Sequence, residues 1–119
     1  MRLRQTDAKV PREGASSPWG AVQGVDVIVP AHVVSVSTSS HGGIWVSPEV
    51  EATIPAACQA LARHYAPAGW YEEDCDCLIP MALVDGFEPR HVAIARRAVR
   101  MDARYAAVAA ELDRRGVTG

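Results

Sequence analysis

The sequence predicts an α+β domain in which a small antiparallel sheet of about three strands packs against two or three helices. Short β-branched segments fill the first half of the chain, and the links between them are too short for crossover connections. Apolar residues at helical spacing follow in the second half and end in one long predicted C-terminal helix. The 119 residues and the hydrophobic content of 49% suit one folded domain and argue against global disorder.

The predicted domain spans residues 17–119. Residues 1–16 are polar and have no periodic pattern, so we expect them to form a flexible N-terminal arm. The domain then opens with Ser17-Pro18-Trp19-Gly20, a turn signature that includes an aromatic anchor.

Three strands are predicted within residues 21–46. Residues 21–29 are rich in valine and stop at Pro30. Residues 32–38 alternate valine with serine at a period of two, which is typical of a half-buried strand. Residues 44–46 form the third strand after a loop of serine, histidine and glycine. Together these segments predict a small antiparallel meander.

Two helical segments are expected to follow the sheet. Ser47-Pro48-Glu49 combines a serine cap with a proline at the first helical position, which predicts a helix start. Pro55 interrupts this element and begins a separate helix over about residues 55–65.

Two further helices are expected in the last third of the chain. Asp76 is a candidate cap for a helix over residues 77–84, because Pro80 is tolerated only close to a helix start. The longest predicted helix covers about residues 89–115. Its single apolar seam consists of Ile94, Ala98, Met101, Tyr105, Val108 and Leu112.

The net charge of −2 conceals an uneven distribution. Residues 19–88 carry one basic and nine acidic side chains, whereas residues 89–119 carry seven basic and three acidic ones. The basic end could attract phosphates, or the two regions could face each other within the fold. Because nucleic-acid modules are usually basic overall, we favour the second interpretation.

A cytoplasmic location without membrane contact is expected. No apolar run approaches the roughly 18 residues that cross a bilayer, and the N-terminus lacks the apolar core of a secretory signal. The three cysteines, Cys58, Cys75 and Cys77, are an odd number and are read as reduced thiols.

The first candidate site is the loop Ser37-Thr38-Ser39-Ser40-His41-Gly42-Gly43. Its hydroxyls, imidazole and glycines could hold an anion, and His41 could act as a base or a metal ligand. No lysine follows the glycines, so the loop is not a phosphate-binding P-loop. The alternative is a hairpin loop in which glycine and serine serve only the turn.

The second candidate site is the acidic segment Tyr71-Glu72-Glu73-Asp74-Cys75-Asp76. Its carboxylates could bind a hard cation, supply a base or contact a partner. The alternative is an acidic segment that leads into a helix, because carboxylates interact favourably with the positive N-terminal end of a helix. Zinc binding by Cys75 and Cys77 with His41, His64 or His32 lacks the usual paired spacing, so no metal and no cofactor is predicted.

Three short motifs in order give the chain a resemblance to a known family. These motifs are Ser17-Pro18-Trp19-Gly20, the stretch from Val36 to Gly43, and the stretch from Tyr71 to Asp76. The chain resembles an uncharacterised family, a domain of unknown function found in bacterial chromosomes, plasmids and phages. The resemblance covers about residues 17–87, with Ser39 standing where the pattern often has proline and Cys77 where it often has tryptophan. It implies a mobile-element context and an association between the histidine loop and the acidic segment.

These observations lead to one leading hypothesis and two alternatives. The leading hypothesis is a non-enzymatic protein-binding factor of a phage or mobile element in a bacterial cytoplasm. Its acidic surface would engage a basic or nucleic-acid-binding partner and inhibit it, for example a host defence complex. The predicted binding residues are Ser37, Thr38, Ser40, His41, Gly42, Gly43, Tyr71, Glu72, Glu73, Asp74 and Asp76.

The first alternative is an enzyme, a metal-assisted hydrolase that uses His41 with Glu72, Glu73 or Asp74. This alternative requires His41 to lie within reach of a carboxylate in a concave pocket. The second alternative is a DNA-binding protein that uses the arginine face of the C-terminal helix, formed by Arg96, Arg97, Arg100 and Arg104.

Overall fold

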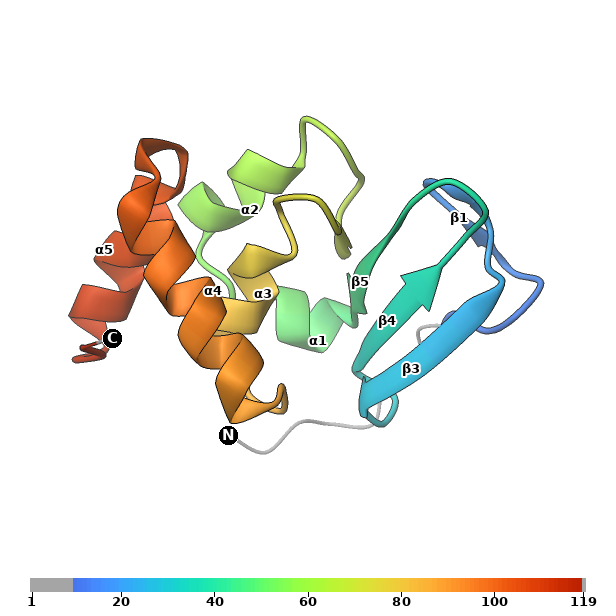
Figure 1. The fold of residues 1–119 in the computed structure, drawn as a ribbon, viewed down its shortest axis with the longest axis horizontal. Coiled ribbons are helices and arrows are strands. Elements are labelled where there is room, and N and C mark those ends of the chain that lie inside the picture. Colours follow the sequence, from blue (N-terminus) through green and yellow to red (C-terminus); the bar gives the residue numbers. More distant parts are fainter. Residues whose placement is uncertain (1–9, 119) are drawn as a thin grey trace.

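The computed structural model describes residues 10–118 and confirms the α+β class (Figure 1). Its main sheet has four antiparallel strands in the order β3-β4-β5-β6. These are β3 (Gly24–Val29), β4 (Val33–Ser37), β5 (Gly42–Val46) and β6 (Trp70–Glu72). A small hairpin, β1 (Ser16–Ser17) with β2 (Gly20–Ala21), precedes the sheet.

The alternation of side chains along β4 and β5 gives the sheet two apolar faces. Val33, Ile44 and Tyr71 belong to the large core that the helices cover. Val34 and Trp45 belong to a smaller cluster on the opposite side. Strand β5 pairs with β4 on one side and β6 on the other, and it is buried along its whole length.

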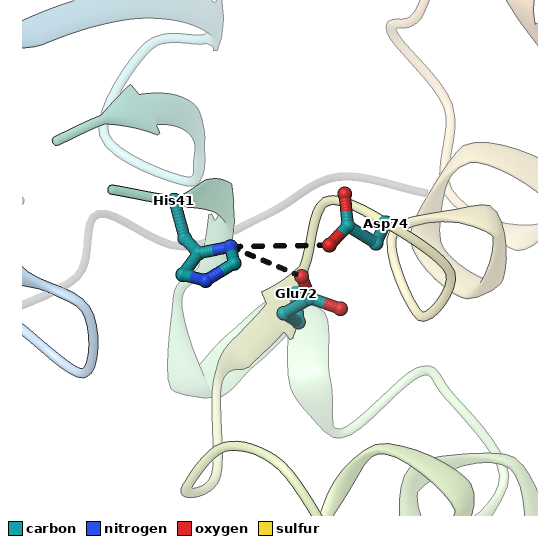
Figure 2. Close-up of side chains that lie close together, drawn as sticks. All are labelled: His41, Glu72 and Asp74. Atoms are coloured by element: carbon teal, nitrogen blue, oxygen red, sulfur yellow. Dashed lines mark ion pairs between the residues drawn. The ribbon is translucent and has the colours of Figure 1, made fainter. Parts of the chain in front are cut away.

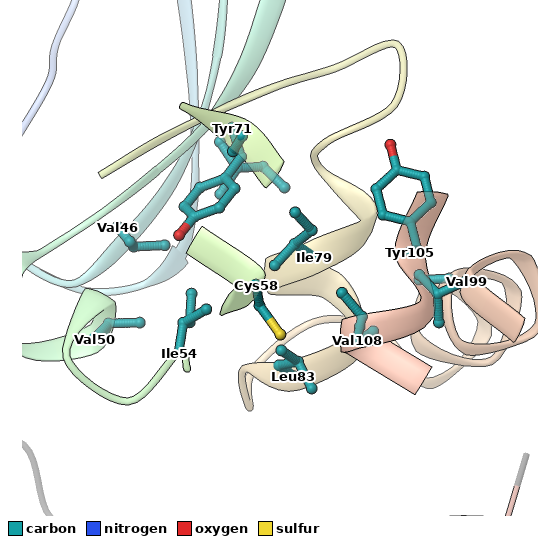
Figure 3. Close-up of a cluster of buried hydrophobic side chains, with 14 of the residues drawn as sticks. Val46, Val50, Ile54, Cys58, Tyr71, Ile79, Leu83, Val99, Tyr105 and Val108 are labelled. Atoms are coloured by element: carbon teal, nitrogen blue, oxygen red, sulfur yellow. The ribbon is translucent and has the colours of Figure 1, made fainter. Parts of the chain in front are cut away.

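The helices gather on one side of the sheet (Figure 1). They are α1 (Pro48–Glu51), α2 (Ala56–Ala62), α3 (Leu78–Leu83), α4 (Pro89–Met101) and α5 (Ala106–Arg114). The Ser47 hydroxyl accepts a hydrogen bond from the Val50 amide at 3.2 Å, which confirms the predicted helix start. Tyr71 from the sheet belongs to the same large core as Ile79 of α3 and Val108 of α5 (Figure 3).

The predicted single helix over residues 89–115 is two helices. Asp102 adopts an extended backbone, with φ −125° and ψ 116°, and ends α4. Its carboxylate accepts the Arg104 amide at 2.9 Å and thereby caps the 3₁₀ turn Ala103–Tyr105 that leads into α5.

The predicted seam is wrong for α4. Ile94 and Met101 are 56% and 79% exposed, whereas Ala95 and Val99 face the core. The break at Asp102 changes the phase of the helical pattern, so the two helices do not share one continuous stripe. Only the second half of the predicted seam, from Tyr105 to Leu112, is buried as expected.

The segment before β1 and the turn of the β1–β2 hairpin pack on the second face of the sheet. Val10 from the first and Trp19 from the second contact the cluster around Val34 and Trp45, and the Gly14 amide donates to the Val22 carbonyl at 2.9 Å. These contacts cover apolar surface that would otherwise face water. The remainder of the predicted arm, residues 1–9, lies outside the described residues.

Candidate functional site

Strand β6, which the sequence analysis did not predict, brings the two candidate segments together. Glu72 pairs with Gly43 and Tyr71 pairs with Ile44, so the acidic segment leaves the sheet beside the histidine loop. The Glu73 amide extends this pairing by donating to the Gly42 carbonyl at 3.0 Å. The association that the family resemblance implied is therefore present in the fold.

The histidine loop is a tight hairpin turn held by Thr38. The Thr38 hydroxyl donates to the His41 carbonyl at 2.6 Å and accepts the His41 amide at 3.1 Å. The Ser40 amide lies 3.3 Å from the same hydroxyl. These contacts show that the Thr38 hydroxyl serves the turn, and they also fix the backbone from which the His41 side chain projects.

The two glycines after His41 permit a close approach of neighbouring groups. A side chain at Gly43 would meet the Trp19 ring at 2.3 Å and the Tyr71 carbonyl at 2.4 Å. A side chain at Gly42 would meet the Val36 carbonyl at 2.5 Å and the Glu73 carboxylate at 2.8 Å. Both glycines are buried, so their role is to let β5 pack between Trp19 and β6.

His41, Glu72 and Asp74 form the candidate site (Figure 2). The His41 Nδ1 atom lies 3.9 Å from Glu72 Oε1 and 3.8 Å from Asp74 Oδ2. The side chains of His41 and Asp74 are 52% and 70% exposed, whereas that of Glu72 is 13% exposed. One imidazole nitrogen and two carboxylate oxygens, all within 4.8 Å of one another, could hold a metal ion.

The charge at this site is not balanced by the arginines of the described chain. Across residues 10–118, no arginine pairs with Glu72, Glu73 or Asp74, and the ion-pair contacts of Glu72 and Asp74 are with His41. Asp76 differs, because the Arg104 guanidinium contacts its carboxylate at 2.6 Å. The acidic segment thus has an outward, anionic part and an inward, neutralised part.

Two of the predicted binding residues, Tyr71 and Asp76, have contacts within the fold. Both side chains are fully buried and are not exposed to a partner in this structure. The Tyr71 hydroxyl donates to Glu51, and Asp76 accepts from Tyr105 at 3.1 Å in addition to Arg104. Asp76 also does not cap α3, whose N-cap position is Cys77 without a side-chain hydrogen bond. Both side chains are turned inward because β6 and α3 lie against the core.

The remaining predicted residues lie around the site. Ser37, Ser40 and Glu73 are exposed, and Thr38 is half-buried. Glu73 is outside the group of three possible ligands, because its carboxylate lies toward Gly42. Of the three carboxylates predicted as partners of His41, those of Glu72 and Asp74 therefore lie beside it, and that of Glu73 does not.

The cysteines lie outside the group of three possible ligands, and the Cys75 thiol donates a hydrogen bond to the Glu72 carboxylate at 3.7 Å. All three are free thiols, and the group of possible metal ligands in the described chain contains none of them. Burial raises the pKa of Cys75, and it raises the pKa of Cys77 to about 12. A thiol with a raised pKa is a poor nucleophile at neutral pH, so the environment of Cys75 and Cys77 does not activate them for nucleophilic catalysis.

The arginines of the predicted DNA-binding face are largely occupied within the fold. Arg96 donates to the Ala82 carbonyl at 3.2 Å, and Arg100 pairs with Asp113 at 2.9 Å. Arg104 pairs with Asp76 as described above. Only Arg97 of the four is exposed with no such contact among the described residues.

Three cavities of the described chain lie away from the site. One of about 480 Å³ is lined by residues of β3, β4, α1 and α3, including Val29, Val33, Val50 and Leu83. Two others, of about 500 and 340 Å³, border α4 and β5. None of the three includes His41, Glu72 or Asp74. The hydrolase alternative therefore meets its distance requirement, but these cavities do not supply its pocket.

Comparison with known families identifies the chain more closely. Residues 12–116 match the model of a domain of unknown function, DUF7007. The chain belongs to the DUF7007 family. Comparisons of this DUF7007 chain with curated proteins and with solved structures give no match. No helix within residues 10–118 is long and apolar enough to cross a membrane.

The sequence carried a signal for the missed strand. Trp70 and Tyr71 are aromatic residues of the kind enriched in strands, and they stand directly before the acidic residues. The acidic residues that follow are also typical of a helix start, so the sequence pattern favoured a helix over a strand at this point. The strand matters because its register with β5 decides which carboxylates lie beside His41.

Proposed function

We propose that this DUF7007 chain is a non-enzymatic binding protein whose anionic edge docks against a basic surface of a protein partner. The anionic edge consists of Glu72, Glu73 and Asp74 with the neighbouring His41. The observation that carries the proposal is that Glu73 and Asp74 project outward without an arginine partner among residues 10–118.

The distribution of ion pairs supports this use of the edge. The arginines of the described chain pair with Glu51, Asp76, Glu111 and Asp113. Those contacts lie within the fold, whereas Glu73 and Asp74 have no arginine partner among residues 10–118, and the ion-pair contact of Asp74 is with His41. An exposed, unneutralised group of carboxylates attracts a positively charged surface and speeds its association.

The nature of the partner follows from this chemistry. A surface that binds nucleic acid is basic, and an anionic protein edge can occupy it in place of phosphates. The mobile-element context implied by the family resemblance favours a host defence complex that handles nucleic acid. Binding would inhibit that complex by covering its nucleic-acid site, in the cytoplasm of a bacterial host.

Matched charge reversals test the proposal. The immobilised chain is used to recover partners from a bacterial lysate, and each recovered protein is purified and its binding measured with a chelator present. The variant Glu73→Lys with Asp74→Lys should weaken binding by about tenfold or more, since like charges across an interface are costly. The control, Asp85→Lys with Glu88→Lys, changes two exposed acids elsewhere by the same charge and should bind like the wild type.

Salt and nucleic acid provide the second part of the test. Binding of the partner should weaken as ionic strength rises, and DNA or RNA bound to the partner should compete with the chain. Equal binding by the two charge-reversed variants would refute the docking edge. Binding of the chain itself to duplex DNA, lost on replacement of Arg97, would favour the arginine face instead.

A further inference from the structure

We infer that His41, Glu72 and Asp74 form a binding site for a divalent transition-metal ion. This inference goes beyond the docking edge, because it assigns a ligand that needs no protein partner. Its basis is the convergence of the His41 Nδ1, Glu72 Oε1 and Asp74 Oδ2 atoms from two separate segments (Figure 2).

The distances suit a shared ion after a small adjustment. Nitrogen and oxygen ligands bind a transition metal at about 2.1 Å, so two of them in a tetrahedral arrangement lie about 3.4 Å apart. The observed distances from His41 Nδ1 are 3.9 Å and 3.8 Å. The three donor atoms lie within 4.8 Å of one another, so bringing them to about 3.4 Å requires shifts of roughly half an ångström to about 1.4 Å, and the side chains of His41 and Asp74 are exposed and have room to make them.

The environment of Glu72 is an independent reason to expect a cation. Its side chain is 13% exposed, and the one hydrogen bond to its carboxylate in the described chain comes from the Cys75 thiol at 3.7 Å. Other largely buried carboxylates have an arginine: Glu51 has Arg63, and Asp76 has Arg104. Buried carboxylates are normally paired or coordinate a metal, and the ion-pair contact of Glu72 in the described chain is with the His41 imidazole at 3.9 Å and not with an arginine.

The fold holds two of the three ligands in place. Glu72 is a residue of β6 and is fixed by its pairing with Gly43. The backbone of His41 is fixed by the Thr38 hydroxyl. Asp74 lies in the exposed turn after β6 and can close over an ion held by the other two.

The donor atoms indicate which ions fit. One imidazole nitrogen with two carboxylate oxygens suits Mn²⁺, Fe²⁺, Co²⁺ or Zn²⁺, whereas Mg²⁺ and Ca²⁺ prefer oxygen ligands throughout. Three protein ligands leave coordination positions for water or for a group from another molecule. A bound ion would also reduce the negative charge of the anionic edge and so would weaken its attraction for a basic surface.

Titration of the full chain with Mn²⁺ alone tests the site. Mn²⁺ is used because it has low affinity for thiols, and loss of the free-ion signal in electron paramagnetic resonance reports binding. One strong site per chain is expected. His41→Gln and Asp74→Asn should each weaken it by about tenfold or more, the scale of effects on metal affinity when a supporting residue is lost.

Two matched variants separate this site from general attraction to acidic surface. Glu73→Gln removes an adjacent carboxylate outside the group, and His64→Gln removes an exposed imidazole elsewhere. Both should retain wild-type Mn²⁺ affinity. In addition, bound Mn²⁺ should broaden the nuclear magnetic resonance signals of the His41 imidazole before those of His64.

Clear outcomes would overturn the inference. These are the absence of a strong site, affinity unchanged in His41→Gln, or an equal loss in Glu73→Gln. Thermal unfolding of each variant checks that it is folded, and the exposed positions 41 and 74 are expected to tolerate their changes. Because the partner assay contains chelator and the Mn²⁺ titration contains no partner, either proposal can fail without the other.

Discussion

Arg104 and Asp76 form an ion pair across 28 residues of sequence, with 2.6 Å between guanidinium Nη1 and carboxylate Oδ1. Asp76 is fully buried, and Arg104 also donates to the Leu61 carbonyl at 3.0 Å. One guanidinium therefore links α2, the inward part of the acidic segment and the turn between α4 and α5. This contact also joins the acidic middle of the sequence to its basic end.

Replacing Arg104 with methionine should destabilise the protein by about 3 kcal/mol. The change leaves the Asp76 carboxylate buried without its cation, and breaking one side of a buried pair typically costs 3–5 kcal/mol. We expect the lower value because the Arg104 side chain is 32% exposed. Urea unfolding measures the effect, and Arg97→Met on the exposed face of α4 is the control. Equal stability of the two variants would show that the pair contributes nothing.

Replacing Gly43 with alanine should cost about 1–3 kcal/mol, the usual range for overpacking. The new methyl group would lie 2.3 Å from the Trp19 ring and 2.4 Å from the Tyr71 carbonyl. Backbone atoms cannot move aside without weakening the pairing of β5 with β6. Chemical denaturation measures the loss, with Ser39→Ala in the exposed turn as a control. A Gly43→Ala protein as stable as the wild type would contradict the close packing described here.

Glu111 should make stability depend on pH in the acid range. Hydrogen bonds from Arg114 and Arg115 lower the pKa of Glu111 from its ordinary value of 4.5 to about 2. A carboxylate with a lowered pKa stabilises the fold fully above the unfolded value and loses that contribution as the pH falls to the folded value. Thermal unfolding should therefore show wild type and Glu111→Gln converging between pH 4.5 and pH 2. A constant difference across that range would rule out this contribution.

The thiols should react slowly in the folded protein. Cys58 is 1% exposed, and burial raises its pKa as well as those of Cys75 and Cys77. Because the thiolate is the reactive form, a disulfide reagent at neutral pH should modify native chains slowly and unfolded chains quickly. Peptide mapping after brief exposure identifies the sites, and Cys58 should be the last to react. Rapid modification of Cys75 in the native chain would contradict the prediction that the folded protein's thiols react slowly.

The sequence by itself determined features that depend on near neighbours. The period of valines predicted β4, and Ser47 with Pro48 predicted the start of α1, because strand periodicity and helix caps act within a few residues. The histidine loop was also recognisable as a turn, since Gly42, Gly43 and the serines have local conformational preferences.

The tertiary structure decided which of the candidate residues meet. Asp76 and Asp74 are two positions apart, yet one is buried against Arg104 and the other is exposed beside His41. The break at Asp102 likewise exposed Ile94, because packing of α4 and α5 on one core overrode the continuous helical pattern. Local sequence could not reveal these outcomes, since burial and ion pairing depend on segments that are far apart until β6 joins the sheet.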